Sequence, residues 1–566
     1  MKKTLLSALA IAIVLGTSAL AKAQETEAAE AKPVLVVSFG GYAELKRDLQ
    51  YLGTVSGNPD MANSLEGLLS FFTQGQGLAG LDQDRPWGAA ASLGDGGAAQ
   101  PSTLVFLPVK DLQKLFSSLA ALVEEPEDKG DGVWAIQKEA YTLYVKEKDG
   151  WAYVSQTAEG LDVLPKDPLK TLGGLEKAYD LALRLNIQNI PQALRDMGVD
   201  ILKRQVETGL QQAADQAEDE EQFELQAQLA RRQLETLSKA INELDEITLG
   251  WAIDSEGKRV VLDLNLTALE GSDTATQLAS VANSTSKFAG FLLPEAMLTA
   301  HMNSVIDKSD IEQSLGMLDK LRGHVMEEID EDEDLPDAAA KKLVKGLVGQ
   351  VLDVAKATVK KGRINAGLAV VGEGPVTIAA GGLVADGAQL EKVARKLVEL
   401  AQEEEGELEI KLDVAEQDGV KFHTVVLPLP DDEDGEKAKQ LFGETLLVTL
   451  GFGSDSLYVS MGDEGIEAIK AVMAQSAEDA EKELPPMEIA VALAPLLQLA
   501  SQQEDANPST AIMAEMLKEE GMDHVKIRVQ PIENGVQYEI EGEEGVIKLI
   551  GSAAKLATAA GGAGGF

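Results

Sequence analysis

A strand, a tight turn, a second strand and a short helix recur six times along the chain, and this pattern limits the fold more than any other feature. The clearest copy spans residues 248–283, with a turn at Ser255-Glu256-Gly257 and a helix that begins near Ser272 or Asp273. Its second strand alternates aliphatic with more polar residues. This period of two predicts that the aliphatic side chains lie on the buried face of a sheet: Val260, Leu262, Leu264 and Leu266.

The other copies have the same order of elements and are found at residues 87–123, 141–164, 363–402, 446–473 and 524–556. Three copies fall in each half of the chain. Two pairs of lone strands also correspond between the halves: residues 34–39 with 297–305, and residues 179–186 with 487–493. The matching order favours an ancient duplication over chance similarity among hairpins, with a period of roughly 270 residues, well above solenoid periods.

The predicted fold is α+β, with two tandem related domains that each form a long, curved antiparallel sheet with helices on one face. The first domain spans residues 34–287 and includes a helical arm at 192–246, and the second spans 288–556. The arm has apolar residues at spacings of three and four, so it can either bind a partner or pack across the sheet. A flexible leader at 24–33 and a disordered Gly/Ala tail at 557–566 flank the domains.

Residues 1–23 resemble a cleaved signal peptide. Lys2 and Lys3 precede an apolar run at residues 5–15, and Ala21-Lys22-Ala23 fits a small-x-small cleavage site. A membrane anchor is the alternative, but this run is shorter than the ~20 residues that a spanning helix needs. We therefore expect an exported protein, periplasmic or secreted, with no transmembrane segment after cleavage.

Composition excludes several classes of function. The net charge of −44 repels nucleic acid, so we expect no nucleic-acid partner. The chain has no cysteine, which rules out disulfides, thiol catalysis and Cys-ligated metal. Acidic turns permit weak binding of divalent cations but lack a complete calcium-loop pattern, so no metal ligand is assigned: Asp330, Asp332 and Asp334, and residues 432–435.

No motif predicts a reactive centre. Residues 75–80 match G-x-G-x-x-G, but a helical stretch precedes them instead of a strand, so a loop is expected and no cofactor is assigned. The four histidines, His301, His324, His423 and His524, have no short metal-ligand spacing. The four tryptophans fall on expected strands, as core residues or as walls of a ligand cleft: Trp87, Trp134, Trp151 and Trp251. No catalytic residue is assigned, and the chain is not expected to be an enzyme.

Four short motifs resemble those of large exported bacterial proteins that have no assigned activity, at residues 51–53, 85–88, 186–191 and 248–251. The repeated hairpins with helices are also similar in outline to envelope lipid carriers, whose curved sheet holds an acyl chain, although a fold alone does not define a function. Three functions follow as hypotheses. The first is a non-catalytic envelope protein that binds a partner or acts as a scaffold. The second is a carrier of an apolar ligand on a concave sheet face, and the third is a hydrolase with a dispersed active site.

Overall fold

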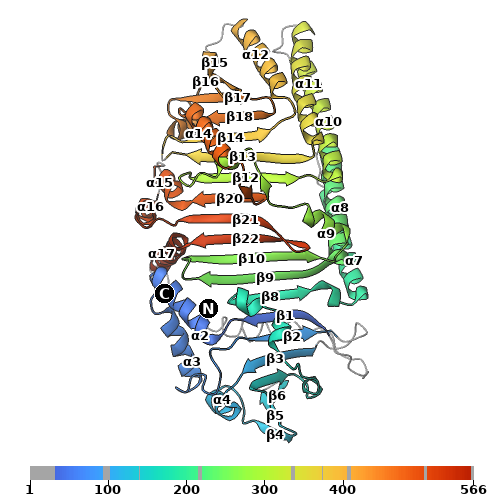
Figure 1. Cartoon of the computed structure of the whole chain (residues 1–566), viewed down its shortest axis with the longest axis vertical. Helices are drawn as coiled ribbons and strands as arrows, with labels where there is room; N and C mark the ends of the chain where they lie inside the picture. Colours follow the sequence, from blue (N-terminus) through green and yellow to red (C-terminus); the bar gives the residue numbers. More distant parts are fainter. Residues whose placement is uncertain are drawn as a thin grey trace. The chain divides into compact units, whose positions relative to one another are not determined.

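The computed structural model describes residues 32–93, 102–138, 141–214, 220–332, 338–372, 374–403, 409–502 and 507–561. The expected signal peptide lies outside this range. The described residues form an α+β protein with antiparallel sheets that are not closed (Figure 1). Contacts divide the chain into two units. The first comprises Met1–Leu278, Glu533–Gly535 and Ile550–Phe566, and the second comprises Ala279–Ile532 and Val536–Leu549.

The sheet of the first unit contains ten strands: β1 Pro33–Phe39, β2 Trp87–Ser92, β3 Ser102–Pro108, β4 Glu127–Gly130, β5 Val133–Lys138, β6 Tyr141–Lys148, β7 Trp151–Ser155, β8 Leu181–Asn186, β9 Leu244–Asp254 and β10 Arg259–Ala268. They lie in the order β4-β5-β6-β7-β3-β2-β1-β8-β9-β10, and each pair is antiparallel. The helices are α2 Tyr42–Val55, α3 Met61–Phe72, α4 Leu112–Leu119, α5 Leu169–Leu172, α6 Leu175–Ala178, α7 Gln192–Ala214, α8 Glu220–Glu243 and α9 Asp273–Ala279.

The main sheet of the second unit also contains ten strands: β12 Leu298–Val305, β13 Arg363–Val371, β14 Thr377–Leu383, β15 Glu409–Gln417, β16 Val420–Pro428, β17 Thr445–Phe452, β18 Ser456–Met461, β20 Met487–Ala492, β21 His524–Ile532 and β22 Gly535–Glu543. Their order is β15-β16-β17-β18-β14-β13-β12-β20-β21-β22. Two short strands, β11 Ser284–Thr285 and β19 Glu483–Leu484, pair separately.

The helices of the second unit are α10 Lys308–Glu331, α11 Ala338–Lys360, α12 Gly387–Glu403, α13 Glu433–Phe442, α14 Gly465–Glu478, α15 Leu493–Ser501 and α16 Pro508–Glu520. A further helix, α17 Glu544–Gly561, begins in the second unit, and its residues from Ile550 onward belong to the first. In the second unit the pair α10 and α11 lies beyond one end of the strands, and the pair α15 and α16 lies beyond the other end (Figure 1). All six predicted hairpins and all four lone strands are present. The predicted helical arm forms α7 and α8, and α17 extends to Gly561, inside the segment for which a disordered tail was expected.

Each sheet has one face that connecting segments cover. In the first unit α5, α6 and the turn before them cover it, around a core of Val36, Phe106, Trp151, Tyr153, Leu161, Leu172, Leu175 and Ala182. In the second unit α14 and the segment after β11 cover it, around Phe288, Phe291, Ala369, Ala379, Phe422, Tyr458, Ile469 and Val472. We call this side of each sheet the covered face.

The prediction that Val260, Leu262, Leu264 and Leu266 lie on the buried face of β10 is wrong. Leu262 and Leu264 are 40% and 37% exposed, whereas Asp263 between them is only 6% exposed. The reason is visible on the covered face. The ring of Tyr179 lies so close to Gly250 that a Cβ atom added at this glycine would be 2.4 Å from the ring. The Tyr179 hydroxyl donates a hydrogen bond to Asp263 over 3.0 Å. Alternation shows which residues share a face, but the packing of Tyr179 decides which face is covered.

Helices are not confined to the covered face, which differs from the expected arrangement. α4 packs on the opposite side of the first sheet, where Leu112, Leu115 and Phe116 contact Val145 and Ala152. In the second unit α12 contacts β17, and its Glu391 lies near His423 of β16. His423 pairs with Leu450 of β17 and points away from the covered face, because its neighbour Phe422 belongs to the core there. Each unit therefore has one helix that covers one end of the otherwise open side.

Two substitutions of the same kind test which face is buried. Leu172→Ala removes a fully buried side chain from the covered face and should lower the free energy of unfolding by about 2–5 kcal/mol. Leu264→Ala removes a side chain that already contacts water, and it should cost less than about 1 kcal/mol. Urea unfolding measures both values. Equal losses for the two variants would contradict the assignment of the faces.

Candidate functional site

The side of the first sheet opposite the covered face carries aliphatic side chains that solvent reaches. The strand register places Val37 beside Leu183, Leu183 beside Leu249, and Leu249 beside Leu264. Large side chains here are between 37% and 44% exposed: Leu35, Leu183, Leu249, Trp251, Leu262 and Leu264. Together with Val37 and Leu185, these residues form what we call the open face of the first unit. Trp251, one of the four tryptophans considered above, lies on it.

The open face of the second unit is also apolar and contains a shallow hollow of roughly 480 Å³. Small residues of β13 and β14 form much of its floor. Ala366 pairs with Gly382 across these two strands, and Ala380 pairs with Leu368. Ala300 and Met302 on β12 continue the floor. Larger side chains surround it: Leu368, Leu457, Val459, Met487 and Ile489. We define these residues as the open face of the second unit.

Charged side chains of the same strands project to the other side of the sheet. On β21, Lys526 donates to Glu543 over 2.6 Å, and Arg528 donates to Glu539 over 2.7 Å. Arg528 also pairs with Glu541, which is 4% exposed. The alternate residues Ile527 and Val529 pair with Ile489 and Met487 of the open face. The alternation therefore keeps ion pairs away from the open face, which presents only aliphatic groups here.

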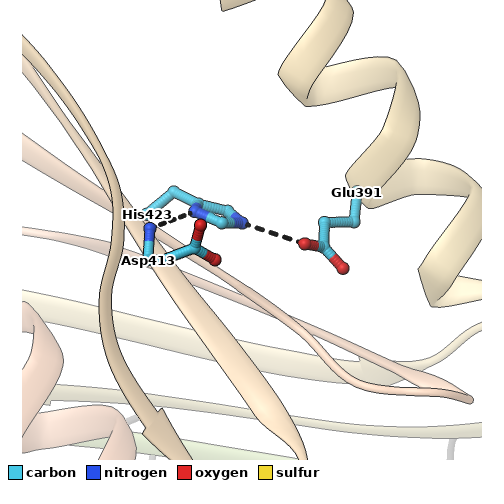
Figure 2. Close-up of side chains that lie close together, drawn as sticks. All are labelled: Glu391, Asp413 and His423. Atoms are coloured by element: carbon cyan, nitrogen blue, oxygen red, sulfur yellow. Dashed lines mark hydrogen bonds and ion pairs between the residues drawn. The ribbon is translucent and has the colours of Figure 1, made fainter.

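A polar cluster lies where α12 covers one end of the second sheet (Figure 2). Glu391 projects from α12, Asp413 from a bulge in β15 and His423 from β16. Asp413 has a left-handed backbone with φ of 54°, which aims it toward the histidine. The backbone N–H of Asp413 donates to His423 Nδ1 over 2.9 Å, and His423 Nε2 lies 3.7 Å from Glu391 Oε1.

Arg395 neutralises the two carboxylates of this cluster. Its guanidinium donates to Glu391 over 2.8 Å and also to Asp413. These hydrogen bonds lower the pKa of Asp413 and raise that of Arg395. Burial, followed by the nearby Arg395 charge, lowers the pKa of His423. The cluster links α12 to the hairpin of β15 and β16 through charge-assisted hydrogen bonds.

The arrangement does not fit a metal ion, although Glu391, Asp413 and His423 place three ligand atoms within 4.8 Å of one another. Because His423 Nδ1 accepts a hydrogen bond, the neutral ring carries its proton on Nε2, the atom that faces Glu391. A metal-ligating histidine has the opposite pattern, since its second nitrogen donates a proton. Arg395 already holds the carboxylates. Sequence reasoning missed this cluster because its members are separated by up to 32 residues.

His301 belongs to a second polar cluster, in the core. The Ser286 hydroxyl donates to Asn365 over 2.8 Å, accepts from the Phe288 backbone over 3.0 Å and faces His301 Nε2 at 2.8 Å. The single hydroxyl proton goes to Asn365, so His301 Nε2 donates rather than accepts. A nucleophilic serine needs the reverse arrangement. Burial lowers the pKa of His301 to about 4, and the network fixes the segment that covers the sheet.

The remaining candidates have structural roles. His524 on β21 faces Glu543 at 3.2 Å, and His324 lies in α10, so the four histidines occupy four elements of the second unit. Residues 75–80 form turns after α3, without a preceding strand. Asp432 caps α13 by accepting from the Gly435 backbone over 2.8 Å. Trp151 is buried beneath Arg85, Trp87 stacks on Phe39, and Trp134 packs edge-on against Phe116.

The side chains of Asp48 and Asp180 in the first unit lie close enough to interact. Asp48 on α2 is 7% exposed, and Asp180 accepts from the Ile253 backbone over 2.6 Å. Burial, with the adjacent Asp180 charge, raises the pKa of Asp48 to about 7. A proton on Asp48 therefore removes the repulsion between the two carboxylates, where α2 lies near the start of β8.

Comparison of the chain with protein-family models, with curated proteins and with solved structures finds no match. Among the residues that the structure describes, no helix has both the length and the apolar character needed to cross a bilayer.

The tautomer of His423 gives a test of the metal assignment. In NMR spectra of histidine-labelled protein at pH 7, His423 should be neutral and protonated on Nε2, and because burial lowers its pKa it should take up a second proton at a lower pH than an exposed histidine. One equivalent of Zn²⁺ should leave its signals unchanged. Loss of the Nε2 proton on zinc addition would show that the cluster rearranges into a metal site.

Asp48 predicts a pH dependence of stability. The pKa of about 7 in the folded protein exceeds the value of ~3.9 for an unfolded aspartate, so the folded state holds an extra proton between these values. The contribution of Asp48 to stability therefore falls as pH rises from about 4 to 7 and is constant above that range.

Asp48→Asn should accordingly match the parent protein near pH 4 and exceed its free energy of unfolding by roughly 1–2 kcal/mol at pH 8. Asp200→Asn on the exposed side of α7 is the control and should leave the profile unchanged. Urea unfolding across this pH range measures the difference. An Asp48→Asn profile parallel to that of the parent would contradict the raised pKa of Asp48.

Proposed function

We propose that this protein is an exported, non-catalytic binding protein of the cell envelope whose ligands are the acyl chains of lipids. The observation that carries the proposal is the open face of each unit, where neighbouring strands present aliphatic side chains to solvent. Soluble monomers rarely expose contiguous apolar surface beyond a few hundred Å², and larger patches mark binding sites. Fully burying a large aliphatic side chain contributes ~1.5–3 kcal/mol of favourable free energy, so an acyl chain that covers such side chains on several strands would bind favourably.

The hollow in the second unit supports an acyl chain as the ligand. Its volume lies within the ~300–1,000 Å³ typical of small-molecule sites. Its depth comes from small side chains at adjacent positions, Ala366, Ala380 and Gly382, so a methylene chain can lie between the surrounding Leu, Val and Met side chains. None of its lining side chains is charged and none is aromatic apart from His301, whose side chain points to the covered face.

This composition favours a lipid over a protein partner. Protein interfaces combine aromatic and arginine side chains with a polar rim and several hydrogen bonds, which fix the orientation of the partner. The hollow offers no such groups. The expected signal peptide at residues 1–23 would also deliver the chain to a compartment that contacts lipid. Binding of this kind needs no reactive centre, which agrees with the polar clusters, whose hydrogen bonds serve packing.

The two units are proposed to descend from one duplicated module. The strand order of the first unit becomes that of the second when β1, β2 and β3 are replaced by β12, β13 and β14, β4 to β7 by β15 to β18, and β8 to β10 by β20 to β22. Paired helices follow the corresponding strands β1, β8, β12 and β20. An experimental structure in which the two strand orders differ would contradict the common origin.

Filling the hollow tests the proposed ligand. The parent protein should bind a fluorescent polyene fatty acid, and Ala380→Phe should weaken binding by about tenfold, equal to ~1.4 kcal/mol, because the ring occupies the floor. Ala357→Phe makes the same change on an exposed position of α11 and should bind normally.

A second readout uses Trp251 on the open face of the first unit. A brominated fatty acid should quench its fluorescence and should leave the buried Trp151 unaffected. A Trp251→Phe variant identifies the quenched signal. Absence of both probe binding and quenching would remove the proposed function, and a dimer that protects Trp251 would instead indicate a protein interface.

A further inference from the structure

A carrier of acyl chains must exchange its ligand with a bilayer, and α3 carries the exposed apolar side chains suited to that contact. One side of this helix faces the protein, through Ala62, Leu65 and Leu69. The opposite side presents Leu68, which is 46% exposed, and Phe71, which is 78% exposed. The rings of Phe71 and Phe72 pack edge to face with their centroids 5.5 Å apart, and this contact holds the exposed Phe71 ring at the end of the helix.

The chain segment that carries Leu68 and Phe71 is uncharged. No Asp, Glu, Lys or Arg occurs between residues 67 and 81, although charged residues make up 25% of the chain. The nearest acidic side chain of the helix, Glu66, pairs with Lys46 of α2 at 2.5 Å. An apolar segment without charge can enter the interface of a bilayer, where Phe and Leu are favoured on the inserted side of a helix.

Residues 74–77, in the middle of the loop after α3, border open space, whereas Thr73 is buried and Gly80 accepts from the backbone of Lys110. A Cβ atom added at Gly67, Gly75 or Gly77 would meet no heavy atom within 4 Å. Gln74, Gly75 and Gly77 have positive φ angles of 51°, 87° and 59°, which turn the chain sharply after the helix. The exposed side of α3 and residues 74–77 therefore form an edge that has no charged residue in its sequence and borders open space at Gly67, Gly75 and Gly77.

We propose that the exposed side of α3, through Leu68 and Phe71, is the segment with which the first unit contacts an uncharged bilayer. This inference rests on the proposed binding of acyl chains and specifies where the ligand is exchanged. The bilayer is zwitterionic rather than anionic, because a net charge of −44 would be repelled by acidic headgroups. Two side chains bury little area, so the contact is weak and reversible.

Vesicles of phosphatidylcholine test the contact with the full chain. The parent protein should float with the vesicles, and a Leu68→Glu/Phe71→Glu variant should lose at least about fivefold of the bound fraction, because two carboxylates would have to enter the interface. Ile512→Glu is the matched control, since Ile512 on α16 is 71% exposed, and it should bind like the parent. In a Phe71→Trp variant, the fluorescence of the added tryptophan, taken as the difference from the parent protein, should shift to shorter wavelength when vesicles are added.

Binding of the fluorescent fatty acid in vesicle-free buffer separates the two proposals. It should be the same in the parent, the Leu68→Glu/Phe71→Glu variant and Ile512→Glu. Unchanged emission of Phe71→Trp together with unimpaired flotation of the double variant would overturn the role of α3 while leaving acyl-chain binding intact. Loss of fatty-acid binding by the parent would instead remove the proposed function. Equal loss of flotation in Ile512→Glu would show a general effect of charge and would also overturn the assignment to α3.

Discussion

The packing of the covered face determines which of the alternating side chains of each strand are exposed to solvent. In the first unit the Tyr179 ring rests on Gly250 and its hydroxyl bonds Asp263, so the polar residues of β10 turn inward. In the second unit Phe288 and Phe291 pack on Ala369 and Ala379, while Ser286, His301 and Asn365 exchange hydrogen bonds beneath them. Since side chains alternate along a strand, each of these contacts places an aliphatic residue on the other side.

Exposure of apolar surface to water is unfavourable, and in most proteins a layer of helices or a second sheet packs on such a surface. Here α4 and α12 provide such a layer at one end of each sheet, and the aliphatic positions farther along stay accessible. The ion pairs of Lys526 and Arg528 lie on the opposite side, where the carboxylates of β22 compensate them. In the second unit charge is thus separated from the aliphatic surface, as the proposed binding of acyl chains requires.

The sequence predicted the elements better than it predicted the surfaces. Turns that contain Asp-Gly or Asn-Gly, such as 148–150 and 534–535, indicated hairpins because residues with positive φ angles are needed there. The hairpin of β15 and β16 was missed because β15 alternates charged with aliphatic residues and is broken by the bulge at Asp413. The open face was assigned to the core because Leu262 and Leu264 look like buried residues, and only the contact of Tyr179 with a distant glycine decides otherwise. The cluster of Glu391, Asp413 and His423 depends on how α12 crosses the sheet, which no spacing in the chain encodes.

Native mass spectrometry of the protein purified from its own cells without detergent tests directly whether the open face binds lipid. We expect mass increments that correspond to lipids or fatty acids and that decrease in an Ala380→Phe variant, since that ring fills the floor of the hollow. A chain that carries no apolar ligand in the native state, and gains none after incubation with lipid, would contradict the reading of the open face as a binding surface.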